Sequence, residues 1–477
     1  MKTPQASSAE PLPSLQFYGG LPGTLAPFLL YLVGVAWLAF SGAPDERGFW
    51  PIILAAITLG LLLATDRTTY CEVLIKGMSQ PITSIMIMAW LLAGVLGSLM
   101  NASGFVEALV WLARQVGLSG GGFVGAAFII SAIVSTSTGT SFGTIFLCGP
   151  LLYPAGGALG ANPAVLIGAI IGGATFGDNV SPISDTTIAS ALSQLADIGG
   201  VVRSRLKYAL PAAGVALILY IAFGTADGAS TPSEVGLSEG NPGGFPMLIV
   251  PVLVITLLLK KRHLIEGLLF GILGGSLIGL AFGLLKPSQF LYIDAENFIA
   301  RGIILDGLER GLGISVLTLL LMGLVTSLQA TGVLNRIVEF AQKRSKTPRG
   351  AEWWIFGAVS SAVLLTMHSV VAILTVGEFS RETGGRFEIS SYRRANILDV
   401  TTSSFPFILP WFIPTILAAG TTVSGEGFGM PRVSPLDTGL NNFHSWMLLI
   451  MIVLAIWTGY GRTFIPDKVN ESSEATN

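Results

Sequence analysis

The chain has 477 residues, of which 51% are hydrophobic and only 11% are charged, and its mean hydropathy is +0.71. Soluble domains carry about 25% charged residues, so the composition excludes an ordinary soluble protein and predicts a polytopic membrane protein. The net charge of −2 argues against a nucleic-acid partner.

Apolar stretches that predict membrane spans occur along the whole chain. Single spans are expected near 25–41, 50–65, 83–101, 208–225, 246–259, 264–285, 313–331 and 444–461. Polar residues interrupt four further apolar stretches, at 122–155, 163–200, 352–380 and 391–420. Non-helical backbone at membrane depth persists only where it faces protein or a water-filled cavity. We therefore expect the functional residues in the four interrupted stretches.

A short internal match suggests that the chain contains two related halves. Gly94 to Phe105 reads GVLGSLMNASGF, and Gly323 to Val333 reads GLVTSLQATGV. Each copy is followed by two interrupted stretches and then by a plain span. The predicted organisation is an N-terminal segment, a first repeat, an external loop, a second repeat and a tail, over residues 1–24, 25–225, 226–244, 245–462 and 463–477.

The distribution of Lys and Arg predicts the orientation. If 122–155 and 352–380 are re-entrant hairpins, most of the 26 Lys and Arg residues fall on one side, including a loop from Arg203 to Lys207. The positive-inside rule makes that side cytoplasmic, together with both termini. The predicted fold class is thus an all-α polytopic membrane protein with two inverted-topology repeats. It has about ten transmembrane helices, two hairpins and broken helices at the midplane, which is typical of secondary transporters.

The most informative motif is Gly172 to Thr187, which reads GGATFGDNVSPISDTT inside an apolar stretch. Gly177 and Pro182 break the helix there. An ionised Asp at the bilayer centre costs about 2.5–3.5 kcal/mol, so Asp178 and Asp185 need a partner or a function. Carboxylates, hydroxyls and free backbone carbonyls are the ligands of hard cations. The candidate ion-binding residues are Asp178, Asn179, Ser181, Asp185 and Thr186, although Asp185 also fits an N-cap of the second half-helix.

The first hairpin carries a run of hydroxyl residues. Ser135 to Ser141 reads STSTGTS, and Thr136, Ser137 and Thr138 are candidates to line a hydrated tip. The alternative is that these hydroxyls bond back to their own helix or join helices together.

The second half repeats the theme of a carboxylate, hydroxyls and a proline. Asn396 to Pro406 reads NILDVTTSSFP, and its candidates are Asp399, Thr402 and Ser403. For Asp399 the alternative is an ion pair with Arg393 or Arg394. His368, at the tip of the second hairpin, is either a titratable site residue or a hydrogen-bonded core residue.

The stretch from Gly172 to Thr187 resembles the NhaC-type Na⁺/H⁺ antiporter family, within the wider ion-transporter superfamily. The resemblance is more diffuse over residues 83–420. It implies a bacterial inner-membrane carrier with inverted repeats, in which Asp178 and its neighbours hold Na⁺ or a proton, and no organic cofactor. Family members commonly have a Pro-Trp-Asn turn in the second half, whereas here Pro410 and Trp411 precede Phe412. That departure leaves the transported species in doubt.

These observations together predict exchange of Na⁺ for H⁺ across the inner membrane by alternating access. Asp178, Asn179 and Asp185 would bind the transported Na⁺, and Na⁺ and H⁺ would compete for the same carboxylates. The Asp399 region would complete the site from the opposite repeat. No GxxxxGK[ST] phosphate loop is present, so an ion gradient is the expected energy source and the chain is not expected to be an enzyme.

Several alternatives remain open at this point. The nearest is a Na⁺-coupled symporter or exchanger of a small organic acid or amino acid. An intramembrane aspartyl protease with Asp178 and Asp399 as its dyad and a channel are more distant. The expected partners are membrane lipids, Na⁺, H⁺ and, in the first alternative, a small organic solute; a homodimer is neither predicted nor excluded.

Overall fold

The computed structural model describes residues 13–41, 46–226, 240–260, 262–295, 299–333 and 346–464. Within these ranges, eight helical segments are long and apolar enough to cross a membrane, and three shorter apolar helices accompany them. The chain is a multi-pass membrane protein, as its composition predicts. Of the predicted terminal segments and external loop, residues 1–12, 227–239 and 465–477 lie outside the described residues.

The helices of the first part of the chain extend to residue 223. They are α1 (Leu21–Phe40), α2 (Phe49–Leu63), α3 (Arg67–Met78), α4 (Pro81–Ala102), α5 (Phe105–Gln115), α6 (Gly120–Thr138), α7 (Ser141–Leu152), α8 (Pro163–Val180), α9 (Asp185–Ser193) and α10 (Ile198–Phe223).

The second part contains the remaining helices and one small sheet. The helices are α11 (Ile249–Leu259), α12 (Leu264–Ala281), α13 (Pro287–Phe290), α14 (Ile303–Gln329), α16 (Pro348–Thr366), α17 (Ser369–Gly385), α18 (Ser391–Thr402), α19 (Ile413–Thr421), α20 (Pro435–Leu440) and α21 (Phe443–Thr458). The strands β1 (Tyr292–Asp294) and β2 (Ile299–Arg301) pair in antiparallel fashion, with Tyr292 opposite Arg301. Apart from this small sheet, which the sequence analysis did not predict, the regular structure of the described residues is helical, so the predicted helical fold is confirmed in its coarse form.

Two helices begin about ten residues before the predicted spans. α14 starts at Ile303 rather than near 313, and α10 starts at Ile198 rather than near 208. Arg205 therefore lies inside α10 and is fully buried. The assignment of Arg205 to a cytoplasmic loop is wrong, because it continues the buried face of α10, one turn after Val201.

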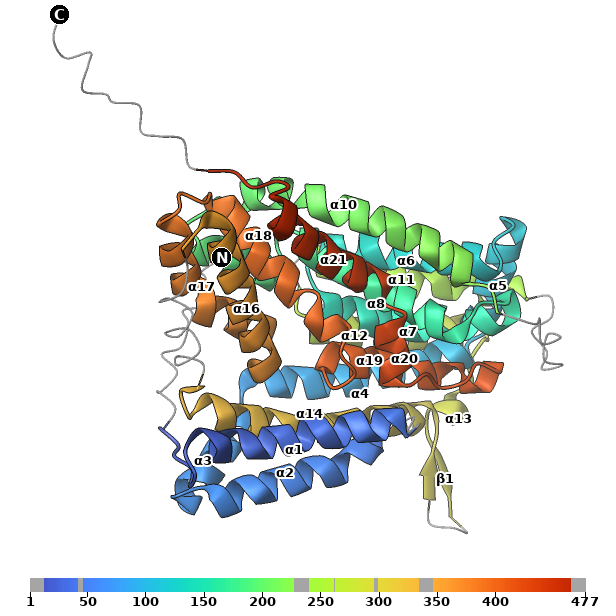
Figure 1. Ribbon diagram of the computed structural model, residues 1–477. Coiled ribbons are helices and arrows are strands. Elements are labelled where there is room, and N and C mark those ends of the chain that lie inside the picture. The colour runs from blue at the N-terminus through green and yellow to red at the C-terminus, as the bar shows by residue number, and fades with distance from the viewer. Residues whose placement is uncertain are drawn as a thin grey trace, which may run out of the picture.

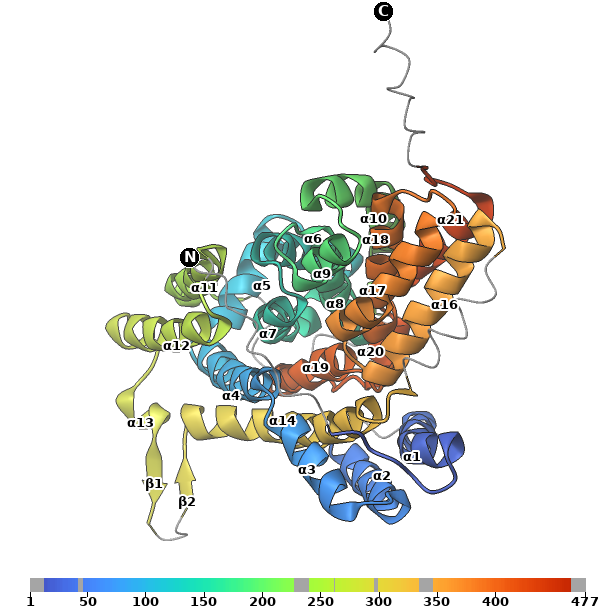
Figure 2. The same cartoon turned by 90° about the vertical axis from the view of Figure 1, so that its left-hand side faces the viewer.

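The helices form two groups in Figures 1 and 2. We call α1, α2, α3, α4 and α14 the scaffold layer; it runs along one side of the molecule. We call α6 to α10, α16 to α19 and α21 the site-bearing bundle; it contains the four interrupted stretches. The long helices α4 and α14 cross closely within the scaffold layer, because a Cβ at Gly94 would lie 2.2 Å from the carbonyl oxygen of Gly307.

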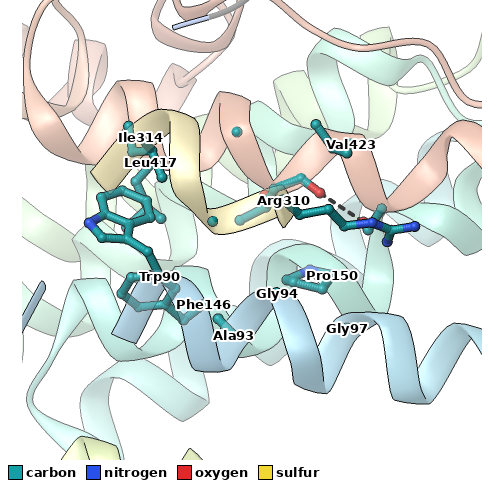
Figure 3. A pocket seen from close by; sticks show the side chains of 14 residues that line it. Trp90, Ala93, Gly94, Gly97, Phe146, Pro150, Arg310, Ile314, Leu417 and Val423 are labelled. Atoms are coloured by element: carbon teal, nitrogen blue, oxygen red, sulfur yellow. Dashed lines mark hydrogen bonds between the residues drawn. The ribbon is translucent and has the colours of Figure 1, made fainter. Parts of the chain in front are cut away.

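A small cavity of about 50 Å³ lies between the scaffold layer and the bundle. Figure 3 shows Trp90 of α4 and Arg310 of α14 on the scaffold side, with Phe146 of α7 and Leu417 of α19 on the bundle side. The rings of Trp90 and Phe146 meet edge to face with centroids 4.9 Å apart. The contact between the two groups is therefore apolar and incompletely filled.

The two copies of the internal sequence match have the same local structure. Each ends a long helix, and the hydroxyl residue just past the helix bonds to the carbonyl three residues earlier: Ser103 after α4 and Thr331 after α14. The glycine that follows has left-handed backbone in both copies, with φ of +77° at Gly104 and +67° at Gly332. The match therefore extends from sequence to helix-end geometry.

Candidate functional site

The second interrupted stretch, 163–200, contains a break between two helices. α8 ends at Val180 and α9 begins at Asp185. Pro182 has no N–H to donate, and its ring disfavours helical backbone at Ser181, whose ψ is 129°. The helix therefore stops where the sequence predicts, and it leaves Asp178 in its last turn.

Glycines bring the α6–α7 hairpin against this last turn. A Cβ at Gly177 would lie 2.2 Å from the backbone nitrogen of Thr136, so only glycine allows α6 to pack this closely. Within the hairpin, Cys148 of α7 lies beside Ser131 of α6. The chain thus reverses direction at its tip, next to the break.

Asp178 is the central carboxylate of the break and is only 6% exposed. Its Oδ2 accepts a hydrogen bond from the Ser141 hydroxyl at 2.9 Å, and its Oδ1 accepts one from the Ser184 hydroxyl at 2.6 Å. The Ser184 oxygen also lies 3.0 Å from Oγ1 of Thr186. Both donors on Asp178 are neutral hydroxyls, which can rotate and present lone pairs to a cation.

Asp185 lies at the N-terminus of α9. It is the first helical residue, and Ser184 occupies the N-cap position, so the predicted capping role is not the one observed. Its Oδ1 accepts the backbone N–H of Thr186 at 2.8 Å. A carboxylate in the first turn of a helix is favoured by the helix dipole.

Asp178 and Asp185 line a shared cavity of about 590 Å³. The hairpin tips, the α8–α9 break, a second break between Thr402 of α18 and Ile413 of α19, and the scaffold layer all contribute to its wall. Arg262, between α11 and α12, also lines it. The polar lining residues are Thr138, Thr140, Ser141, Asp178, Asp185, Thr186, Arg262, His368 and Ser369. The rest of the lining is largely apolar.

The tips of the two hairpins have the same backbone geometry. Gly139 and Met367 follow the first helix of each hairpin with left-handed φ of +69° and +52°. The next residues, Thr140 and His368, are the N-caps of the return helices. For Met367 this conformation costs about 1–2 kcal/mol relative to a right-handed one, so the surrounding packing must hold the tip in place.

The first residues of the return helices contact the two breaks. Ser141 donates to the Asp178 side chain, and Ser369 donates to the carbonyl oxygen of Thr402 at 2.9 Å. His368 lines the cavity with its Nδ1 buried and without a hydrogen-bond partner in the described part of the chain. Its predicted role as a titratable site residue stays a prediction.

Asp399 has a different environment from Asp178. It is fully buried, and its Oδ2 lies 2.8 Å from Nη1 of Arg205, whose side chain is also fully buried. Oδ2 also accepts from the Ser190 hydroxyl at 3.1 Å. Oδ1 accepts from Nδ2 of Asn179 at 3.0 Å and from the Ser403 hydroxyl at 3.1 Å. The alternative reading of Asp399, an ion pair with Arg393 or Arg394, is wrong in its partner, because the ion pair is made with Arg205.

Arg393 takes part in a second buried cluster. It forms a two-point ion pair with Glu352, with distances of 2.8 and 3.1 Å, and Arg462 reaches the same carboxylate at 2.7 Å. This cluster fastens α16 and α18 to the segment that follows α21. Arg394 instead donates to Oε1 of Gln194 at 3.0 Å.

Several predicted hydroxyls bond to their own helices. Thr136 and Thr138 donate to the carbonyls of the residues four positions earlier, and Thr402 does the same in α18. Ser137 lines a separate groove of about 390 Å³. Ser181 is buried and accepts the N–H of Ile183 at 3.4 Å. Their predicted roles in ion binding stay predictions.

Sequence reasoning missed four side chains that complete these contacts: Ser141, Ser184, Ser190 and Arg205. Ser141 and Ser184 are part of the motifs singled out, but nothing local distinguishes them from neighbouring hydroxyls. Arg205 could have been found, because it follows Val201 and precedes Tyr208 and Ala212 at helical spacing on a buried face.

Comparison with known proteins identifies the part of the chain that holds this break. Residues 22–225 match the model of the Na⁺/H⁺ antiporter family. The first half of this chain is similar to the Na⁺/H⁺ antiporter family. This half includes the α6–α7 hairpin, Asp178, Asp185 and Arg205, and the predicted resemblance is confirmed.

Three relatives show how varied the proteins similar to this chain are. The Na⁺/H⁺ antiporter NhaC of Alkalihalophilus pseudofirmus is 28% identical over 294 residues, which cover 60% of this chain and 63% of that protein. The malate-2H⁺/Na⁺-lactate antiporter of Bacillus subtilis is 25% identical over 92% of this chain and 94% of its own. The arginine/ornithine antiporter ArcD of Halobacterium salinarum is 25% identical over 74% of this chain and 75% of its own.

Proposed function

We propose that this protein is a secondary active transporter that exchanges Na⁺ for H⁺ across a bacterial inner membrane by alternating access. The observation that carries the proposal is the pair Asp178 and Asp185 on one cavity, with only neutral hydroxyl donors on Asp178. The match of residues 22–225 to the Na⁺/H⁺ antiporter family supports the same function. No organic cofactor is required.

The chemistry of the site gives a simple form of coupling. A Na⁺ ion takes oxygen ligands, and Asp178, Asp185 and the hydroxyls of Ser141, Ser184 and Thr186 offer them around one cavity wall. A proton on Asp178 would remove the charge that holds Na⁺. Because the two cations compete for the same carboxylates, each can be carried only when the other has left.

The fold proposed for this cycle has two inverted repeats. Its basis is the order of elements: a long helix, a hairpin, a broken helix and a terminal helix occur as α4, α6–α7, α8–α9 and α10, and again as α14, α16–α17, α18–α19 and α21. The matching ends of α4 and α14 and the matching hairpin tips support the same arrangement. About ten spans and two re-entrant hairpins would result, with broken helices near the midplane.

The position of the cavity indicates which side of the membrane the site faces. It reaches Arg262, in a turn that the positive-inside rule assigns to the cytoplasm. We infer an inward-open state with both termini in the cytoplasm. Movement of the site-bearing bundle against the scaffold layer, across the contact in Figure 3, would expose the carboxylates to the other side.

A second candidate function is Na⁺-coupled transport of a small organic solute. The observation in its favour is the cavity volume of about 590 Å³, with a largely apolar lining beside the carboxylates, which exceeds what a bare ion needs. Two relatives are named for organic solutes: malate and lactate, and arginine and ornithine. In this case Na⁺ binding would depend on the solute.

The geometry argues against an aspartyl protease. A protease dyad needs two carboxylates that share a proton. Asp178 bonds to Ser141 and Ser184, whereas Asp399 is held by Arg205 and three neutral donors. Asp399 is paired with a charged arginine, and no hydrogen bond joins it to Asp178 among the described residues.

The test is transport by the purified protein in proteoliposomes. An imposed pH gradient should drive Na⁺ uptake without any organic solute, and Na⁺ added outside should drive proton movement in return. Uptake that requires malate, lactate, arginine or ornithine would replace simple exchange by the second candidate function. No Na⁺ movement under either condition, from protein that is folded by thermal melting, would refute both.

A further inference from the structure

Asp399 has no position left for a transported ion. Protein groups surround both carboxylate oxygens: Asn179 and Ser403 donate to Oδ1, the Ser190 hydroxyl reaches Oδ2, and the charged Arg205 Nη1 lies 2.8 Å from Oδ2. The exposed fraction of the Asp399 side chain is 0%. Asp399 is also absent from the lining of the 590 Å³ cavity, which both Asp178 and Asp185 share.

The cation on Asp399 is a side chain of the protein. The guanidinium of Arg205 stays charged under all physiological conditions and has a fixed, planar set of donors. Its Nη1 donates to the Asn179 carbonyl oxygen and, at 2.8 Å, to Oγ1 of Thr187. Its Nε donates to Oδ1 of Asn396 at 3.1 Å. The group is therefore neutralised and held from several directions at once.

The Arg205–Asp399 pair connects the two broken helices. Arg205 belongs to α10, its contacts Asn179 and Thr187 belong to α8 and α9, and Asp399 belongs to α18. Asn179 is bound twice, because its backbone oxygen accepts from Arg205 and its side-chain amide donates to Asp399. Since Asn179 directly follows Asp178, these two bonds fix the last turn of α8, which carries Asp178.

We propose that Arg205 is a resident cation that permanently occupies, at Asp399, the place a second transported cation would take. Cation exchange is then confined to Asp178 and Asp185, and Arg205 and Asp399 act as positioning residues through Asn179. The inference deepens the proposed function and rests on it for the identity of the transported ion. The pairing of Asp399 with Arg205 and its absence from the cavity lining rest on geometry alone.

The test separates a positioning role from an ion-binding role by the number of cations bound. In the charge-neutral double variant Arg205→Gln/Asp399→Asn, the count of Na⁺ bound per chain should equal that of the wild type. The reversal potential of transport should stay the same, because Asp178 and Asp185 retain their ligands. The Na⁺ half-saturation should rise by about threefold, because the bonds that position Asn179 are weakened. A folded double variant that binds one cation fewer would overturn the proposal.

The single variant gives the opposite expectation. Arg205→Gln leaves the Asp399 carboxylate without its cation, so it should bind one additional cation per chain and shift the reversal potential. Arg205→Lys should restore the wild-type count. Arg203→Gln, an exposed arginine on the same helix, is the matched control and should change neither quantity. A folded Arg205→Gln protein with an unchanged cation count and reversal potential would contradict a resident cation.

The outcome can be told apart from failure of the proposed function. Cation counts are measured on purified protein at equilibrium and do not require transport. If the wild type does not exchange Na⁺ for H⁺ but Arg205→Gln still takes up one more cation than Arg205→Lys, the proposed function fails and the resident cation stands. If the wild type exchanges Na⁺ for H⁺ but the double variant binds one cation fewer, the proposed function stands and the resident cation is refuted.

Discussion

Asp178 and Asp399 are each near the end of a helix that a proline-containing segment interrupts, yet their surroundings are opposite. Asp178 is bonded to two hydroxyls and borders a cavity. Asp399 is paired with a buried arginine and is sealed. A charged partner stabilises a buried carboxylate, but it also takes the place where a transported cation would bind. The comparison teaches that a carboxylate available for exchange must be left without a permanent cation.

The largest expected effect comes from the open carboxylate. Asp178→Asn removes the negative charge, and we expect Na⁺-driven exchange to fall by roughly 100-fold or more, because charged interactions of this kind are worth about 1.5–3 kcal/mol each. Transport in proteoliposomes measures it. Glu378→Gln, an exposed carboxylate on α17, is the matched control and should keep wild-type rates. Wild-type exchange in Asp178→Asn would show that Asp178 is not the exchanging group.

The closed carboxylate should respond through stability instead. Arg205→Gln alone leaves a buried charge without its partner, and we expect a loss of about 3–5 kcal/mol in the free energy of unfolding. Arg205→Gln/Asp399→Asn should recover most of that loss, since neither charge remains. Chemical unfolding in detergent compares the two variants. Equal destabilisation by both variants would mean that the loss does not come from leaving the Asp399 charge unpaired.

A smaller effect is expected from the hydroxyl that reaches Asp178 from the hairpin tip. Ser141→Ala removes one neutral hydrogen bond to a carboxylate and one candidate Na⁺ ligand. We expect the Na⁺ concentration for half-maximal transport to rise roughly tenfold, which corresponds to about 1.4 kcal/mol. A change in the maximal rate with unchanged half-saturation would place Ser141 in the movement of the hairpin rather than in ion binding.

The smallest effect is expected from a hydroxyl that bonds to its own helix. Thr402 donates to carbonyls within α18, so Thr402→Val removes no contact with a carboxylate. Na⁺ half-saturation should stay within about twofold of the wild type. A tenfold change would show that Thr402 rotates toward an ion during the cycle and that the two halves share the site after all.

Local chemistry made part of this site predictable. Gly177, Asp178 and Pro182 predict a break, a buried charge and a cation site from residues that are adjacent in the sequence, and the structure has the break there. The antiporter-family resemblance depends on the same run. The interruptions at 122–155, 352–380 and 391–420 were predictable in the same way, because polar residues within an apolar run are visible in the sequence.

The partners of the carboxylates were not predictable in this way. Arg205 lies in a basic run that reads as a loop, and only the start of α10 at Ile198 turns it into a buried residue. Its pairing with Asp399 depends on how α10 packs against α18, which no local pattern encodes. The β1–β2 hairpin was missed because both strands are only three residues long.

The measurement that tests the central claim most directly is equilibrium binding of radioactive Na⁺ to three purified proteins: the wild type, Asp178→Asn and Arg205→Gln/Asp399→Asn. If one carboxylate region exchanges cations and the other is permanently filled, the wild type and the double variant will bind equal amounts of Na⁺. Asp178→Asn will bind almost none. In the wild type and the double variant, a lower pH will reduce Na⁺ binding, because protons compete for the same carboxylates. Na⁺ binding that survives in Asp178→Asn but disappears in the double variant would contradict the account and assign the exchanged ion to Asp399.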